Sequence, residues 1–286
     1  MKIYKSIKWL SIILLTGLAL LFYGWLEARW VKVTPVVIES GDIPRSFDGK
    51  RIAFVSDIHH GAPLSIERVQ KLVQRINDLH PDIIILGGDY VSMEKKYIEP
   101  VYRELGKLTC KYGVYGVLGN HDYFVSGELS KKMIARTNIK LCDNKSYWLK
   151  INKDSIKIGG VDDPDGSGPV LDSTIYDVHR HDFCILISHR PEYVEHINTD
   201  KVDLTLSGHT HGGQVTIFGL WAPILPTEKA KWASLALTRE SQKYCYGLSH
   251  PKPGIQTYIT SGIGTQFPHV RFFRRPEIAL LELKRK

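Results

Sequence analysis

The stretch RIAFVSDIH, residues 51–59, sets the pattern on which the fold is built. Its apolar side chains predict a short buried strand, and Asp57 and His59 follow that strand directly. The stretch DIIILGGD at residues 82–89 repeats the pattern, with Asp89 after the apolar run. Three later stretches do the same: GVYGVLGNHD at 113–122, FCILISHR at 183–190 and VDLTLSGHTH at 202–211. Ligands in open α/β sheets gather at the carboxyl ends of strands, so these polar residues are expected to converge.

Helices are expected between these strands. Ser65 can cap a helix whose apolar residues recur at helical spacing until His80-Pro81 stops it. Further helices are predicted at residues 99–108 and 127–136. The second half is richer in strands, predicted at 146–151, 155–160, 183–187, 202–206, 256–260 and 278–283. This mixture favours an α/β sandwich with two packed sheets inside and helices outside.

Residues 9–26 form an uncharged segment of 18 positions, which is long enough to span a bilayer as a helix. Trp9 and Trp25 would lie near the two membrane interfaces, where aromatic rings are favoured. A cleaved signal peptide and a buried core helix are the alternatives. The segment lacks a small-x-small cleavage site and has no polar face, so an uncleaved anchor is favoured.

The chain is therefore expected to have three parts. Residues 1–32 form a membrane anchor that spans at about 9–26. Residues 33–50 form an extended lead-in, and residues 51–286 form one globular domain. The basic residues before the span favour a cytoplasmic N-terminus, which places the globular domain of a single-pass protein outside. Basic residues after the span weaken this bias: Arg29, Lys32, Arg45, Lys50 and Arg51.

The formal net charge is +8. No stretch resembles a nucleic-acid module with interleaved aromatic residues, so no nucleic-acid partner is expected. The basic tail after Arg271 could meet anionic lipid headgroups or phosphates, or form a solvated edge. The four cysteines are widely spaced without a C-x-x-C pair, which favours buried free thiols and assigns no disulfide: Cys110, Cys142, Cys184 and Cys245.

Several of the polar residues have the spacing of metal ligands. Asp57 and His59 are two apart, so their side chains leave an extended backbone on one side and can reach one ion. His209 and His211 repeat this spacing, and His189 adds a histidine at another strand end. Glycines, which let the backbone approach a ligand closely, precede three of the candidates: Asp89, Asn120 and His209.

The ordered blocks resemble the calcineurin-like metallophosphoesterases, and most of all their membrane-associated bacterial phosphodiesterase branch. The blocks are Asp57-Ile58-His59, Gly87-Gly88-Asp89, Gly119-Asn120-His121-Asp122 and Gly208-His209-Thr210-His211. The similarity runs from about Arg51 to Leu283 and includes the less general endings at 261–264 and 275–278. It implies a metallophosphoesterase-type four-layer α/β/β/α sandwich behind an N-terminal transmembrane helix.

The resemblance also implies a centre of two divalent metal ions. The residues that match ligands of the first metal are Asp57, His59 and His211. Those that match ligands of the second are Asn120, His189 and His209. Asp89 would bridge both metals, and His121 matches the position that faces the substrate.

Two carboxylates, one amide and four imidazoles without a thiolate suit manganese, iron or zinc rather than copper(I) or an iron–sulfur cluster. Two such metals lower the pKa of a bridging water and neutralise phosphoryl oxygens, so the expected reaction is in-line attack by the resulting hydroxide. His121 would act as general acid toward the leaving oxygen.

One departure narrows the class of enzyme. Serine/threonine phosphatases of this superfamily carry an Asp-Arg pair soon after the Gly-Asp block, and residues 90–94 read YVSME instead. The absence of this Asp-Arg pair argues against a protein phosphatase. It also removes the aspartate that usually partners the catalytic histidine. Asp122 and Asp163 are the candidates for that role, and the adjacent His60 is a candidate substrate contact.

The sequence therefore predicts a membrane-anchored hydrolase of a phosphodiester or pyrophosphate, with a phosphorylated substrate that could be lipid-linked. The resemblance also admits a UDP-2,3-diacylglucosamine pyrophosphatase of lipid A synthesis, whose nucleotide-sugar substrate is cytoplasmic, so the topology discriminates between the two. A non-catalytic membrane scaffold is disfavoured because all seven ligand positions and His121 are filled. The oligomeric state is left open.

Overall fold

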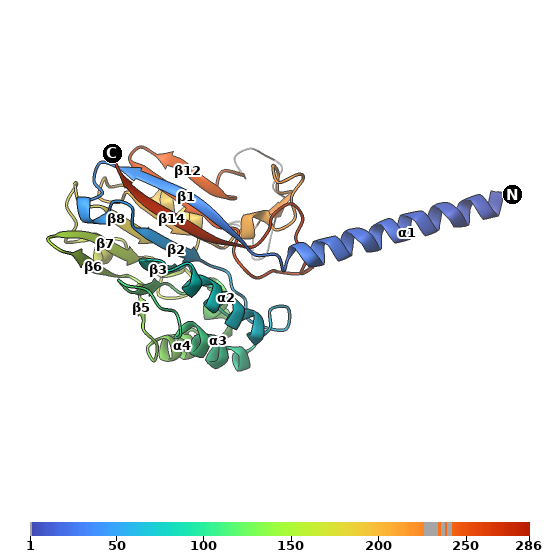
Figure 1. Cartoon of the computed structure of the whole chain (residues 1–286), viewed down its shortest axis with the longest axis horizontal. Helices are drawn as coiled ribbons and strands as arrows, with labels where there is room; N and C mark the ends of the chain where they lie inside the picture. The colour runs from blue at the N-terminus through green and yellow to red at the C-terminus, as the bar shows by residue number, and fades with distance from the viewer. Residues whose placement is uncertain (1, 226–233, 236–237, 239–241) are drawn as a thin grey trace.

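The computed structural model describes residues 2–225, 234–235, 238 and 242–286. Figure 1 shows two β-sheets stacked in the body of the molecule and the long helix α1 (Lys2–Glu27) projecting away from it. Within the described residues, one helical segment, Ser6–Glu27, is long and apolar enough to cross a membrane, and only 6% of its apolar window is buried.

The first sheet has six strands in the order β1-β14-β2-β3-β4-β5. They are β1 (Lys32–Ser40), β2 (Arg51–Val55), β3 (Ile83–Leu86), β4 (Val114–Gly116), β5 (Ile139–Leu141) and β14 (Glu277–Arg285). Strands β2 to β5 are parallel, while β14 runs antiparallel to β2 and parallel to β1. The carboxyl ends of β2, β3 and β4 therefore meet at one edge.

The second sheet has the order β12-β13-β9-β8-β7-β6. Its strands are β6 (Lys145–Ile151), β7 (Asp154–Gly160), β8 (Cys184–Ile187), β9 (Leu204–Ser207), β12 (Gly247–Lys252) and β13 (Ile255–Ile259). Its four inner strands are parallel to one another. The outer strands β12 and β6 are antiparallel to their neighbours β13 and β7, respectively. A separate short pair joins β10 (Ile224–Leu225) to β11 (Ser234–Leu235).

Three helices cover the outer face of the first sheet: α2 (Ile66–Asp78), α3 (Ile98–Leu105) and α4 (Asn120–Ile134). The outer face of the second sheet carries only α5 (Asp172–Ile175) and the 3-10 helix η3 (Pro191–His196) among the described residues. Other 3-10 turns are η1 (Arg45–Phe47), η2 (Lys95–Tyr97) and η4 (His211–Gly213). The predicted α/β/β/α sandwich is confirmed, with a thin fourth layer.

The apolar runs of the sequence are explained by strands that are buried on both faces. On β2, Ala53 and Val55 pack in the core beneath the helices, whereas Ile52 and Phe54 pack in the core between the sheets. Parallel strands covered on both sides read as continuous apolar stretches rather than as alternating ones. A third core lies between the second sheet and its short helices.

Two segments differ from the expectation. The helix predicted at residues 127–136 forms the second part of α4, and a kink at Ser126, with φ −177° and ψ 95°, separates it from a first part that begins at Asn120. Asp122 accepts a hydrogen bond from the Gly119 N–H at 2.9 Å and caps this first part. The lead-in contains β1, which joins the edge of the first sheet next to β14. The four cysteines are free thiols; Cys142, Cys184 and Cys245 are buried, whereas Cys110 is half-buried.

Glu277, at the start of β14, ties the two sheets together. It is fully buried, and its carboxylate accepts hydrogen bonds from Thr34 on β1 at 2.6 Å and from Tyr258 on β13 at 2.9 Å. Tyr246 donates another at 2.8 Å, and the Lys32 ammonium lies 3.4 Å away. Burial alone would raise the pKa of Glu277, but these donors and the ammonium lower it.

Replacement of this carboxylate is predicted to destabilise the fold. Glu277→Gln places an amide N–H₂ among buried donors, so we expect a loss of about 2 kcal/mol or more, or roughly 4–8 °C in melting temperature. Because the pKa is lowered from 4.5, the carboxylate's contribution is full above that pH and disappears as the pH falls through the folded-state pKa.

The measurement is thermal unfolding of the full chain in detergent at pH 7 and again in acid. Glu282→Gln is the matched control, since Glu282 lies on the same strand and is exposed. Equal melting temperatures for the two variants at pH 7 would contradict the role given to Glu277.

Candidate metal centre

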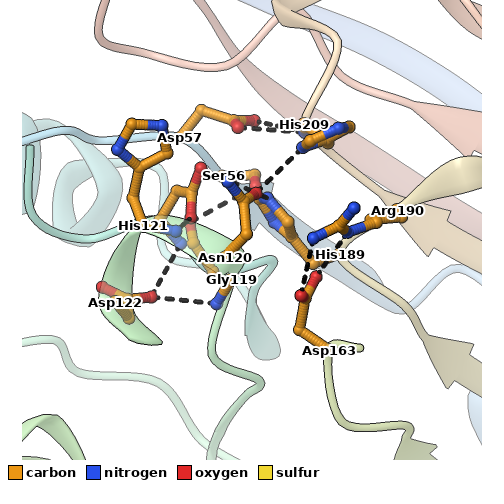
Figure 2. Close-up of polar contacts among 12 residues, drawn as sticks. Ser56, Asp57, Gly119, Asn120, His121, Asp122, Asp163, His189, Arg190 and His209 are labelled. Carbon is orange, nitrogen blue, oxygen red and sulfur yellow. Dashed lines mark hydrogen bonds and ion pairs between the residues drawn. The ribbon is translucent and has the colours of Figure 1, made fainter. Parts of the chain in front are cut away.

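The candidate site lies where strands of both sheets end. Asp57 and His59 follow β2, Asp89 follows β3, and Asn120 opens α4 shortly after β4. From the second sheet, His189 follows β8, and His209 and His211 follow β9. The structure brings the seven residues predicted as ligands together, with His121 beside them. Figure 2 labels five of these eight residues: Asp57, Asn120, His121, His189 and His209.

The first group consists of Asp57, His59 and His211, whose candidate ligand atoms lie within 4.8 Å of one another. The Nε2 atoms of His59 and His211 are 3.1 Å apart. Both oxygens of Asp57 accept from the His209 backbone N–H, at 2.9 and 3.1 Å, which fixes the carboxylate (Figure 2).

The second group consists of Asp89, His189 and His209, again within 4.8 Å. Asn120 belongs to it as well, because its Oδ1 lies 3.1 Å from His189 Nε2 and 3.0 Å from His209 Nδ1. Asp89 also reaches the first group, since its Oδ2 is 3.2 Å from His189 Nε2 and 3.5 Å from His59 Nε2. One carboxylate oxygen thus lies between the two groups.

Burial makes most of the imidazoles neutral. It lowers the pKa of His59 to about 3, and lowers the pKa values of His209 and His211 well below their ordinary range. His189 differs: burial would lower its pKa as well, but the carboxylates of Asp89 and Asp57 raise it to about 10. Neutral imidazole is the form that binds a metal.

These donors fit divalent cations. Ring nitrogens of His59 and His211 face each other and also face carboxylates, with His211 Nε2 3.8 Å from Asp57 Oδ1. A cation between them would satisfy the nitrogen lone pairs and the buried carboxylate charge together. Asn120 offers its amide oxygen toward the second group in the same way.

The backbone at the site is strained. Five non-glycine residues have left-handed φ values: Asp57 at 53°, His59 at 49°, Asp89 at 55°, His209 at 69° and His211 at 52°. Such conformations cost on the order of 1–3 kcal/mol each and gather at functional sites. The glycines serve close approach, because a Cβ on Gly119 would lie 2.3 Å from an Asp89 oxygen and one on Gly208 2.1 Å from the Ser56 hydroxyl.

His121 is oriented by a backbone group. Its Nδ1 lies 3.1 Å from the carbonyl oxygen of Ser92, which can only accept, so Nδ1 carries the proton and Nε2 is left free for the site. Neither predicted aspartate fills this role, because both are engaged elsewhere. A carbonyl partner leaves no signature in the sequence, since every residue has one.

Asp122 holds the site loops instead. Its buried carboxylate accepts from the backbone N–H groups of Gly119 at 2.9 Å, Asp89 at 2.9 Å and Tyr90 at 3.0 Å. It therefore fixes the loop after β3 against the start of α4. Asp163 forms a bidentate pair with Arg190, at 2.9 Å to both Nε and Nη2 (Figure 2).

Sequence reasoning missed Gln266. Its amide Nε2 lies 3.2 Å from Nε2 of both His59 and His121. Gln214 holds it with two hydrogen bonds, one to the Gln266 carbonyl at 2.9 Å and one from the Gln266 N–H at 2.8 Å. The signal in the sequence that could have indicated Gln266 is its position, shortly after the Ser261–Gly264 segment that carries part of the family resemblance.

The basic tail is structural where it begins. Arg271 is fully buried, and its guanidinium donates to the carbonyls of Ser261 and Gly264 at 2.7 Å each. It therefore supports the loop beneath the site and is not part of a lipid-facing patch. His60 is also buried, with its Nδ1 2.9 Å from the Leu64 carbonyl, so it does not act as a substrate contact.

A cavity of about 310 Å³ opens beside the second group. Its lining includes His189, Arg190 and Tyr193.

Comparison with known proteins identifies the family. Residues 50–213, more than half of the chain, match the family model of calcineurin-like phosphoesterases. The uncharacterized metallophosphoesterase YkuE of Bacillus subtilis is 29% identical over 269 residues, covering 92% of this chain and 90% of that protein. A transmembrane protein with metallophosphoesterase domain from Danio rerio is 26% identical over 276 residues, covering 92% of this chain and 60% of that protein.

An uncharacterized metallophosphoesterase of Campylobacter jejuni is 28% identical over 251 residues. The match covers 86% of this chain but only 62% of that protein's length. Among solved structures, a 5'-nucleotidase precursor from Thermus thermophilus aligns with a TM-score of 0.46 at 12% identity, covering 82% of this chain and 54% of that one. An archaeal phosphodiesterase aligns with a TM-score of 0.39 at 15% identity, covering 74% and 84%.

The family match extends over the strand ends that bring the aspartates, the histidines and Asn120 together. This chain therefore belongs to the calcineurin-like phosphoesterases.

Proposed function

We propose that the protein is a membrane-anchored hydrolase of a phosphodiester or pyrophosphate that works with two divalent metal ions. The ligands of the first metal would be Asp57, His59 and His211. Those of the second would be Asn120, His189 and His209. Asp89 would bridge the two, and His121 would be the general acid.

The position of Asp89 carries this proposal. Its Oδ2 is within 3.5 Å of ring nitrogens from both groups, His59 on one side and His189 on the other. A single carboxylate between two sets of donors is the arrangement that holds paired metals. Manganese, iron and zinc suit the donor set. When bound, the two ions would lower the pKa of a water and neutralise the phosphoryl oxygens for in-line attack.

The chain's own contribution is proton transfer and positioning. With Nδ1–H held by the Ser92 carbonyl, His121 presents Nε2 to the site, where a protonated ring would donate to the leaving oxygen. The contact of 3.2 Å between Gln266 and this Nε2 marks where a hydrogen-bonding group of a substrate would stand.

A lipid-linked substrate is supported by exposed aromatic residues beside the site. The Phe124 ring lies 6.4 Å from the His121 ring and is 64% exposed. Phe267, directly after Gln266, is 87% exposed. Two large apolar side chains next to a charged centre suit a molecule that combines a phosphate with an apolar part.

The proposed membrane topology is supported by the sequence and by helix α1, which projects from the body of the protein. We propose an anchor at residues 1–32, a lead-in at 33–50 that supplies β1, and a catalytic domain at 51–286. Basic residues before the span support a cytoplasmic N-terminus and a single-pass protein with its catalytic domain outside. On that side UDP-2,3-diacylglucosamine would not meet the enzyme.

Loss of the bridging carboxylate is predicted to abolish activity. Even removal of an outer-shell partner costs a metal site 10–100-fold, so Asp89→Ala should lower hydrolysis of bis-p-nitrophenyl phosphate by more than about 100-fold. The assay uses the full chain in detergent with manganese, zinc or a chelator. Asp78→Ala, at an exposed carboxylate of α2, is the control. Activity that survives both Asp89→Ala and the chelator would exclude the proposed centre.

Removal of His121 is predicted to slow catalysis without emptying the metal site. His121→Ala should lower kcat by about 10²–10⁴-fold while two metals per chain remain bound. The loss should be larger for an alkyl phosphodiester than for a p-nitrophenyl ester, because a poor leaving group depends more on protonation. His250→Ala, at an exposed position, serves as control. An equal loss on both substrates would refute the acid role.

Metal binding is predicted to release a proton from His189. Because the pKa of this ring is about 10 without metal, the ring is protonated at neutral pH, and a cation must displace that proton. Affinity should therefore rise with pH, by up to about tenfold per unit for one proton. Titration calorimetry in two buffers of different ionisation enthalpy counts the protons. Binding that is independent of pH between about 6 and 9 would contradict this coupling.

A further inference from the structure

A cluster of large apolar side chains is exposed beside the base of α1. It consists of Ile217, Phe218 and Leu220 on one short loop and Phe273 on another, with exposed fractions of 55, 74, 86 and 49%. We call these four residues the apolar patch. Soluble surfaces rarely gather so many large apolar residues without a partner.

The patch is built into the fold. The loop of residues 217–221 is closed by the Ile217 N–H, which donates to the Trp221 carbonyl at 2.7 Å. The Phe218 and Phe273 rings lie 5.4 Å apart. The two loops are joined further back, where the Thr216 N–H donates to the Phe272 carbonyl at 3.0 Å.

The patch is fastened to the last turns of α1. The Arg271 N–H donates to the Gly24 carbonyl at 2.9 Å, and the Phe273 N–H donates to the Glu27 carboxylate at 2.9 Å. The Phe272 ring packs so closely that a Cβ on Gly24 would lie 2.7 Å from it. The Tyr23 ring is 6.4 Å from the Phe273 ring. In Figure 1 an orange loop and a dark red loop lie beside this end of α1.

These contacts set the depth of the patch. The apolar segment of α1 runs to Glu27, and Tyr23 lies four residues before that end. At 1.5 Å per residue, the contacts with Tyr23 are about 6 Å inside it along the helix axis. Arg29 stacks on Trp25 at 3.7 Å, a pairing typical of the boundary between lipid and water. A bilayer that surrounds α1 therefore also reaches the patch.

We propose that the apolar patch inserts into the lipid interface next to α1 and holds the catalytic domain in a fixed orientation on the membrane. The inference rests on the membrane anchoring proposed above. Its partner is the bilayer surface itself, reached because the patch continues the apolar surface of the spanning helix.

The orientation brings the metal centre toward the lipid. The loop that ends at Phe273 passes Gln266, whose amide contacts His59 and His121, and the exposed Phe267. The other loop of the patch follows His211 after a few residues. Both loops therefore lead from the metal centre to the membrane, and a phosphoester at the bilayer surface would meet the site without leaving the interface.

Fluorescence quenching of single labels tests the proposal. The full chain with Cys110→Ser removes the one cysteine that is not buried. Leu220→Cys, at an 86% exposed position, is labelled with bimane and reconstituted in phosphatidylcholine–phosphatidylglycerol vesicles. Leu15→Cys within α1 is the positive control, and Tyr176→Cys, 75% exposed at the end of α5, is the aqueous control. Hydrolysis of bis-p-nitrophenyl phosphate confirms that each labelled protein is folded.

We expect shallow doxyl-labelled lipids to quench the label at 220 while aqueous iodide does not, and the reverse at 176. If the label at 15 is quenched by deep doxyl lipid but that at 220 responds only to iodide, the patch is in water and the inference is wrong although the anchor stands. Protection of 220 from both quenchers would assign the patch to a protein contact and also overturn it. If 15 is not quenched by lipid, the anchor and the inference fall together, whereas the metal chemistry is unaffected.

Discussion

The placement of one carboxylate, that of Asp89, governs the arrangement of the site. It lies within 3.5 Å of ring nitrogens of His59, which follows a strand of the first sheet, and of His189, which follows a strand of the second. Without metal, the protonated ring of His189 supplies the charge that compensates this buried carboxylate, and divalent cations would supply it once that proton has left. The left-handed backbone at Asp57, His59 and the other strand ends is the conformational cost of aiming these side chains at the same space.

Much of this site can be predicted from the sequence because parallel strands place their ends together. The apolar run before each polar block gives the strand, and the carboxyl end of that strand gives the location of the block. Asp122 was a candidate partner of His121 on sequence grounds, but its carboxylate instead accepts from backbone N–H groups of Asp89 and Tyr90, more than 30 residues away in the chain. For the same reason, the sequence did not indicate that the Ser92 carbonyl and the Gln266 amide both contact His121.

Two further features, the buried Arg271 and the strand β1, were not predicted because they also depend on partners that are distant in the sequence. Arg271 sits in a run of basic residues that suggests an exposed tail, yet its guanidinium is buried among carbonyl oxygens. A residue's charge alone does not reveal such partners. The lead-in likewise gives a weak strand signal, because β1 is an edge strand with Pro35, and its pairing depends on β14 at the far end of the domain.

That pairing of β1 with β14 has a consequence for how the protein is made. Lys32, just after α1, lies next to Glu277, and β14 lies between β1 and β2 in the sheet. During translation the early strands emerge long before β14, so the sheet cannot be completed until nearly the whole sequence has left the ribosome. Strand β2 can pair with β3 before then, but its other edge stays open and β1 has no partner until β14 is available.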